Sequence, residues 1–150
     1  MKVSAIMSRN LLTVSPEDSV EKAVQLFRQR RVRHLLVLEN QRLVGMLSDH
    51  DLMRAMEPLR TRKKLLNLGG LFFLLEPFEV REIMTRNVIS VSPEYSLQDA
   101  AGLMVRSRFG ALPVVSSKGE VVGIVTQTDL LRCLAKAPLR GALPSRLPHI

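Results

Sequence analysis

The sequence has little cysteine, few aromatic side chains and no long apolar run. Its single cysteine, Cys133, cannot form a disulfide within the chain, which favours a reducing compartment. Trp is absent and there is one Tyr, so stacking of single-stranded bases on aromatic rings is disfavoured. The most apolar stretch, 65–75, is shorter than the roughly 20 residues of a membrane-spanning helix. The first residues contain no long apolar run, so we expect no secretory signal. We therefore expect a cytoplasmic chain without a membrane span.

The patterns of common catalytic and metal sites are missing as well. The three histidines, His34, His50 and His149, do not share metal-ligand spacing, and Cys133 has no Cys or His near it in the sequence. There is no Walker loop, no Ser-His-Asp order and no pair of catalytic carboxylates in a shared context. We therefore expect neither an enzyme nor a metal site.

Positive charge is abundant. The formal net charge is +8, from 22 Lys and Arg against 14 Asp and Glu. Such a surplus attracts anions, and nucleotides, nucleic acids and anionic lipid surfaces all qualify. A nucleic-acid binder is one alternative, which the arginines of segment 28–33 favour and the scarcity of aromatic residues disfavours.

An internal repeat is the strongest signal in the sequence. The segment from Val3 aligns with the segment from Val80, and 20 of the 52 positions up to Arg54 are identical. Average composition would give about three or four identities by chance. One extra residue enters the second copy near Lys118, where a hairpin turn is expected. We divide the chain into repeat 1 (1–54), a connector (55–79), repeat 2 (80–135) and a C-terminal tail (136–150).

Each repeat predicts the order strand, helix, strand, strand, helix, and therefore an α/β (α+β) fold. Short β-prone runs, 11–14 and 88–91, end at Ser-Pro, and apolar residues at helical spacing follow. Segments 35–38 and 43–47 then predict a hairpin, after which a second helix begins. The connector is expected to be a helix that packs on the module or on a partner subunit. A segment that touches a membrane or docks an effector is the alternative.

The order of the motifs resembles the CBS (cystathionine-β-synthase) domain. Both copies contain Ile-Met-Ser/Thr, Val-Ser-Pro-Glu, Leu-x-Val, Val-Gly and Ser/Thr-x-x-Asp-Leu in the same order. Two such repeats in tandem resemble a Bateman module, a pair of α/β units related by a pseudo-two-fold axis with a cleft on each side. Inosine monophosphate dehydrogenase carries a similar module beside a catalytic barrel that this sequence does not contain.

The resemblance implies a regulatory function rather than catalysis. The implied ligand is an adenosyl nucleotide such as AMP, ADP, ATP, NAD or S-adenosylmethionine, and no catalytic cofactor is implied. Homodimers are common in the family, and a regulator also needs a protein effector, which the sequence does not identify. A module that only binds other proteins, with empty clefts, is a second alternative.

The family pattern assigns ribose binding to Asp51 and Asp129, with Ser48 and Thr126 beside them. An ionised carboxylate only accepts hydrogen bonds, so it suits the two hydroxyls of a ribose and repels a bare phosphate. The same Ser/Thr-x-x-Asp spacing is that of a helix capping box, in which the hydroxyl caps backbone N–H groups. Both interpretations remain open, and one residue can serve both roles.

The resemblance also implies residues for phosphate and adenine. Arginines before the middle strand would suit phosphate through bidentate hydrogen bonds, although they would equally complement a helix C-terminus. The middle strand keeps the family's Pro at Pro113 but has Leu36 in the first copy, so the two clefts need not bind equally. The implied phosphate-binding residues are Arg31, Arg33, His34 and Arg108. The implied adenine pocket consists of Leu12, Thr13, Ile89, Ser90, Phe109 and Gly110.

Overall fold

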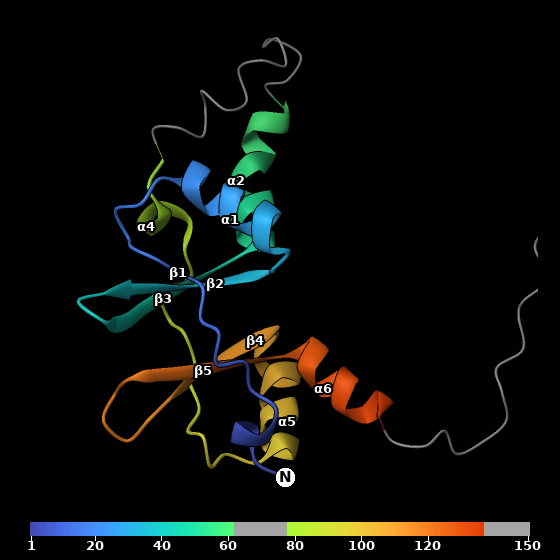
Figure 1. Ribbon diagram of the computed structural model, residues 1–150. Coiled ribbons are helices and arrows are strands. Elements are labelled where there is room, and N and C mark those ends of the chain that lie inside the picture. The colour runs from blue at the N-terminus through green and yellow to red at the C-terminus, as the bar shows by residue number, and fades with distance from the viewer. Residues whose placement is uncertain (62–77, 137–150) are drawn as a thin grey trace, which may run out of the picture.

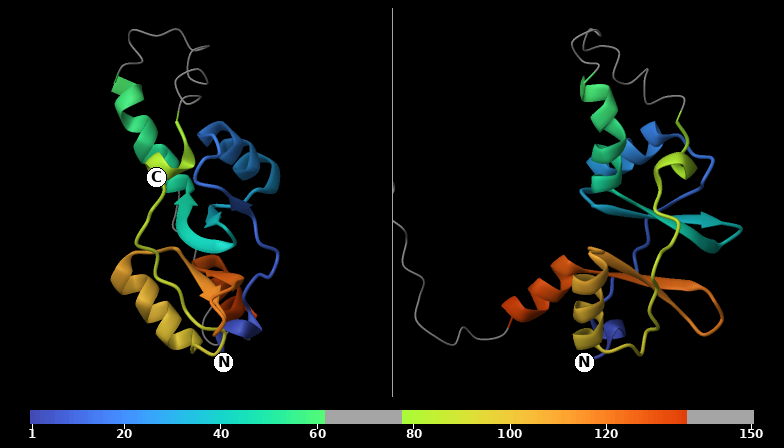
Figure 2. Two further views of the ribbon diagram at one scale, coloured as in Figure 1. Left: turned by 90° about the vertical axis from the view of Figure 1, so that its left-hand side faces the viewer. Right: turned by 180° about the vertical axis from the view of Figure 1, so that it is seen from behind.

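Two small sheets lie face to face, with helices on their outer sides (Figures 1 and 2). The computed structural model describes residues 1–61 and 78–136. The first sheet contains β1 (Thr13–Val14), β2 (His34–Glu39) and β3 (Arg42–Ser48), and the second contains β4 (Ala111–Val115) and β5 (Val121–Thr126). The helices α1 (Val20–Arg30), α2 (Asp49–Thr61) and α4 (Val80–Ile83) lie with the first sheet. The 3-10 helix η1 (Val3–Ala5) and the helices α5 (Leu97–Ser107) and α6 (Gln127–Ala135) lie with the second.

The predicted order of elements is confirmed, except for the first strand of repeat 2. In repeat 1, β1 pairs in parallel with β2, and Leu36 N donates to Leu12 O over 3.1 Å. The residue equivalent to Leu36 is Pro113, which has no N–H and cannot donate the matching hydrogen bond. The 88–91 run therefore forms a single parallel bridge, Val91 with Val114, in place of a strand.

Both hairpins form where the sequence predicts them, and each has a turn of its own kind. Asn40 and Gln41 connect β2 to β3 with φ values of 51° and 65°. Two consecutive residues with positive φ are typical of a tight two-residue hairpin turn. The turn from β4 to β5 is longer, and Gly119 has a φ of 83° there. The extra residue of repeat 2 thus lies in a turn.

The first segment of each repeat packs on the other repeat. Val3 N donates to Tyr95 O over 2.8 Å, and Ser8 forms a bridge with Ile124 of β5. In the opposite direction, Thr85 N donates to Met46 O of β3 over 2.9 Å. Each spatial half of the molecule therefore contains a short segment of the other sequence repeat, which the alignment of the two copies does not reveal.

This exchange explains the Val-Gly motif of both repeats. A Cβ atom at Gly45 would lie 2.6 Å from Met84 Sδ and 3.0 Å from Thr85 O. A Cβ atom at Gly123 would lie 2.6 Å from Met7 Sδ. The Ile-Met-Ser/Thr motif of one repeat thus packs directly on the Val-Gly motif of the other, and only glycine leaves enough room.

The two halves meet through a small apolar cluster between the sheets. Leu36, Met46 and Ala111 are its buried members, and partly buried side chains such as Ile124 surround it. Each half also has a core of its own, which lies between its sheet and its helices. The molecule is therefore two small cores joined by a limited interface and by the crossing segments.

Parts of the predicted connector and tail fall outside the described residues. Helix α2 continues to Thr61, so the connector begins as a helix, whereas 62–77 and the tail residues 137–150 are not described. Within the described ranges, no helix is both long and apolar enough to cross a membrane.

Enlarging the two packed glycines is expected to destabilise the fold. Gly45→Ala and Gly123→Ala should each lower the free energy of unfolding by about 1–3 kcal/mol, because the added methyl group meets a backbone carbonyl as well as a methionine. Gly102→Ala is the control, since its Cβ would meet only the flexible end of Arg106 in α5. Chemical denaturation measures all three, and equal midpoints would contradict this explanation of the packing.

Candidate functional site

A cavity of about 1000 Å³ opens between the two halves, and equivalent positions of both repeats line it. These positions are the loops before β2 and β4 and the junctions where β3 enters α2 and β5 enters α6. The volume lies at the upper end of the roughly 300–1000 Å³ that small-molecule pockets occupy. The cavity therefore has two related halves and room for a ligand of nucleotide size.

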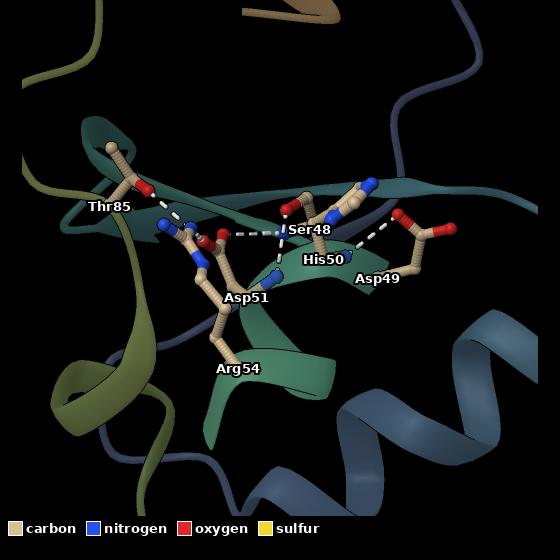
Figure 3. Close-up of polar contacts among 6 residues, drawn as sticks. All are labelled: Ser48, Asp49, His50, Asp51, Arg54 and Thr85. Atoms are coloured by element: carbon tan, nitrogen blue, oxygen red, sulfur yellow. Dashed lines mark hydrogen bonds and ion pairs between the residues drawn. The ribbon is translucent and has the colours of Figure 1, made fainter. Parts of the chain in front are cut away.

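Asp51 combines a helix-capping role with a place in the cavity (Figure 3). Its Oδ2 accepts a hydrogen bond from Ser48 N over 2.9 Å, and Ser48 Oγ accepts one from Asp51 N over 3.1 Å. Its Oδ1 pairs with the guanidinium of Arg54 and accepts from the Thr85 hydroxyl over 3.4 Å. Among the described residues, Asp51 is the one buried charged side chain.

Asp129 repeats this arrangement at the start of α6. Its Oδ2 accepts from Thr126 N over 2.8 Å and from the Thr126 hydroxyl over 2.7 Å. Its Oδ1 faces Arg132 Nη1 at 3.3 Å, and all three residues line the cavity. Each aspartate thus uses one oxygen to hold the helix start and directs the other toward an arginine of the cavity wall. The two interpretations of the motif are compatible.

Arg31 and Arg108 occupy backbone positions that usually suit glycine. They follow α1 and α5 as C-caps, with φ values of 51° and 59°. A left-handed conformation costs a residue with a side chain about 1–2 kcal/mol, and glycine is the usual choice at this position. Both side chains line the cavity, and neither forms an ion pair with a described residue. Strained residues of this kind cluster at functional sites, which supports a role for the two side chains.

His34 makes the two halves of the cavity unequal. It begins β2, and its imidazole reaches the opposite repeat, where a Cβ on Gly110 would lie 3.4 Å from Nε2. The equivalent residue in repeat 2 is the buried Ala111, which has no polar group in its side chain. The first half of the cavity therefore has an imidazole where the second half has a methyl group.

Burial lowers the pKa of His34 below its ordinary value of 6.5. The carboxylates of Asp49 and Asp51 act in the opposite direction, while the nearby Arg33 and His50 add to the lowering. Desolvation is the largest of these effects. It lowers the pKa because burial disfavours the charged imidazolium. The imidazole is therefore neutral near pH 7 and can either donate or accept a hydrogen bond.

The structure brings most of the predicted site residues to this one cavity. Thr13 does not line it, since its side chain alternates away from the buried Val14 and is exposed. Ile89 and Ser90 are also exposed and lie outside the lining. The predicted residues that do line the cavity are Ser48, Asp51, Thr126, Asp129, Arg31, Arg33, His34, Arg108, Leu12, Phe109 and Gly110.

Several polar residues of the lining were not predicted. Arg54 and Arg132 hold the two aspartates, and Ser8 and Thr85 occupy equivalent positions on the exchanged segments. Asn10 lies in the lining as well. The sequence signal that could have identified such residues is the presence of the same polar residue at equivalent positions of both repeats, as for Arg54 and Arg132. Within the described residues, no three His, Cys, Asp or Glu side chains are grouped so that they could hold a metal ion.

The chain belongs to the CBS domain family, whose pattern matches residues 3–58 and 80–136. It is 35% identical over 129 residues to inosine-5'-monophosphate dehydrogenase of Korarchaeum cryptofilum. This match covers 86% of this chain but only 23% of that enzyme. It is 29% identical to protein MJ1426 of Methanocaldococcus jannaschii, with 89% of this chain and 91% of that protein covered. The relatives thus include both a large enzyme and a protein of similar extent.

Two crystal structures of CBS pairs resemble this fold closely. One is CBSX2 in complex with AMP, at 30% identity and a TM-score of 0.72, covering 90% of this chain and 96% of that one. The other is the CBS pair of protein MJ0100 with 5'-methylthioadenosine and S-adenosyl-L-methionine, at 25% identity and a TM-score of 0.72, with the same coverage. The predicted tandem CBS fold is confirmed. The nucleic-acid alternative is not favoured, since the ligands of both structures are adenosine derivatives.

Titration of His34 is expected to weaken the fold in acid. Because its folded pKa is lowered, the unfolded chain binds more protons below about pH 6.5, and stability falls by up to about 1.4 kcal/mol for each pH unit until the folded imidazole also titrates. His34→Gln should flatten this dependence in denaturation curves recorded between about pH 7 and 5. His50→Gln, which replaces an exposed ring, is the control for a histidine substitution. Identical pH profiles for all three proteins would refute the assignment.

Relief of the left-handed backbone should raise stability. Arg31→Gly and Arg108→Gly are each expected to increase the free energy of unfolding by up to about 1 kcal/mol, because glycine adopts positive φ without steric penalty. Gln41→Gly, in the hairpin turn at a φ of 65°, is the control outside the cavity. Denaturant midpoints measure the gain, and a loss in both arginine variants would show that the side chains themselves stabilise the fold.

Proposed function

We propose that the chain is a regulatory module that binds an adenosine nucleotide between its two CBS repeats and does not itself catalyse a reaction. The observation that carries this proposal is the pair of aspartates, Asp51 and Asp129, which each direct one carboxylate oxygen to the cavity. The adenosine ligands of two related CBS pairs support it.

Each part of the nucleotide has chemically suitable residues in the lining. A carboxylate accepts hydrogen bonds from both hydroxyls of a ribose, and the neighbouring Ser48 and Thr126 hydroxyls can join that network. The phenyl ring of Phe109 and the Leu12 side chain offer apolar surface to adenine, and Gly110 leaves space beside them. The phosphates would contact Arg31, Arg33, His34 and Arg108.

Binding at this place would change how the two halves pack. The cavity wall comes from both repeats, whereas their direct apolar contact is the small cluster around Leu36, Met46 and Ala111. A ligand that prefers one arrangement of the halves shifts the population toward it by its difference in affinity. An effector that contacts both halves would respond to this shift.

Assembly, effector and compartment are further parts of the proposal. Val105 on α5 and Leu131 and Leu134 on α6 are apolar and largely exposed, which suits an interface in a homodimer. The regulated effector is unidentified, and the cytoplasm stays a prediction, since one relative, CBSX2 of Arabidopsis thaliana, is chloroplastic.

Nucleotide binding is tested by the shift in thermal unfolding with AMP, ADP, ATP, NAD and S-adenosylmethionine. At a ligand concentration of 100 times Kd, the protein should gain about 2.7 kcal/mol of stability. Asp51→Asn and Asp129→Asn should weaken binding by about tenfold to a hundredfold, since a hydrogen bond to a charged group contributes about 1.5–3 kcal/mol.

Asp99→Asn is the matched control for these variants. At the start of α5, Asp99 N donates to Ser96 Oγ as Asp51 N donates to Ser48 Oγ, but Asp99 lies outside the cavity lining. It should therefore bind nucleotides like the unaltered protein. An absence of any shift with all five compounds at millimolar concentration would defeat the proposed function.

A further inference from the structure

Both carboxylates proposed to bind ribose form the same kind of ion pair. Arg54 pairs with Asp51 Oδ1 and Arg132 pairs with Asp129 Oδ1, in each case three residues along the helix. The arginine side chains are 70% and 65% exposed, whereas the aspartate side chains are only 5% and 16% exposed. Each carboxylate, buried at Asp51 and partly buried at Asp129, is thus paired with a guanidinium group that lies mostly in water.

A bound ribose and these arginines need the same oxygen. The Oδ2 atom of each aspartate already accepts a backbone hydrogen bond at the helix start, from Ser48 N or Thr126 N. Only Oδ1 is directed away from that bond, and the guanidinium occupies it. At Asp51 the Thr85 hydroxyl shares Oδ1 with the guanidinium, at 3.4 Å. A sugar hydroxyl that takes the lone pair used by the guanidinium must therefore displace the arginine, and the aspartate exchanges a charged partner for a neutral hydroxyl.

The displaced arginine would need a new anionic partner. Five arginines line the cavity, against the three carboxylates of Asp49, Asp51 and Asp129. Release of Arg54 and Arg132 from their aspartates adds two free positive charges to a wall that already carries Arg31, Arg33 and Arg108. A phosphate group compensates these charges and accepts bidentate hydrogen bonds from guanidinium, whereas the sulfonium of S-adenosylmethionine would add to the surplus.

We propose that Arg54 and Arg132 are exchange residues, which leave the ribose carboxylates on binding and pass to the ligand's phosphates. The inference rests on the proposed function and refines it, because it selects phosphorylated adenosine compounds over adenosine and over S-adenosylmethionine. Exposure of the two arginines makes the exchange feasible, since their side chains move through solvent without repacking the core. They act as specificity-determining residues at the point where sugar and phosphate meet.

The test compares an uncharged and a charged ligand of the same nucleoside. Calorimetric Kd values for adenosine, ATP and S-adenosylmethionine are measured with the unaltered protein, Arg54→Gln, Arg132→Gln and the double variant. The unaltered protein should prefer ATP. Loss of an arginine should weaken ATP binding by about tenfold, because a charge-assisted contact disappears, and should leave adenosine binding equal or tighter, because a competitor is removed.

Two controls separate this exchange from simpler explanations. Arg106→Gln removes the same charge from the exposed face of α5, outside the cavity, so it measures the general electrostatic contribution to ATP binding. Arg54→Lys retains the charge but not the bidentate geometry, and should recover part of the ATP affinity. Both variants are expected to leave the affinity for adenosine within a factor of about two, well below the tenfold step.

The outcomes that overturn the exchange differ from those that overturn nucleotide binding. An equal loss of affinity for adenosine and ATP in Arg54→Gln would mean that the arginine only holds Asp51 in place, and the proposal would be wrong. Unchanged ATP affinity in the double variant, or a loss no larger than that of Arg106→Gln, would also overturn it. If no adenosine compound binds the unaltered protein, the proposed function itself fails.

Discussion

Each aspartate at the start of α2 and α6 divides its carboxylate between two tasks, and the rest of the site depends on this division. One oxygen accepts from the backbone N–H of Ser48 or Thr126 and fixes the first turn of the helix. The other oxygen pairs with an arginine of the cavity wall, Arg54 or Arg132. A carboxylate that is held by its own helix start is preorganised, so a ligand need not order it.

The exchanged segments connect this site to the architecture of the whole chain. Met84 packs on Gly45 of β3, and this contact places the hydroxyl of Thr85 within 3.4 Å of Asp51 Oδ1. Thr85 belongs to repeat 2 in the sequence but to the first half in space. Asp51 is therefore in direct contact with the segment that leads into the second half. This contact is a physical route by which a change at Asp51 can affect the packing of the two halves.

The two halves of the cavity are related but chemically unequal. His34 stands where repeat 2 has Ala111, and Arg33 stands where it has Gly110. The first half thus carries an imidazole and a guanidinium at positions where the second half has a methyl group and no side chain. A pseudo-symmetric fold therefore offers two environments, as the single Pro at the middle strand had suggested for the two clefts.

The sequence by itself determined the duplication. It also determined the order of helices and strands, apart from the 88–91 run, and both hairpin turns, because helices and hairpins depend mainly on residues close together in the chain. It did not determine which Ser-x-x-Asp element serves a site. Ser48 with Asp51 and Ser96 with Asp99 have the same spacing and form similar hydrogen bonds at a helix start, yet only the first pair lines the cavity. That difference arises when the two sheets pack face to face and the N-terminal segments cross, since a cavity is made by surfaces distant in the chain. The repeat marked Arg54 and Arg132 as a matched pair, but only the tertiary structure placed them in the site and left Thr13 outside it.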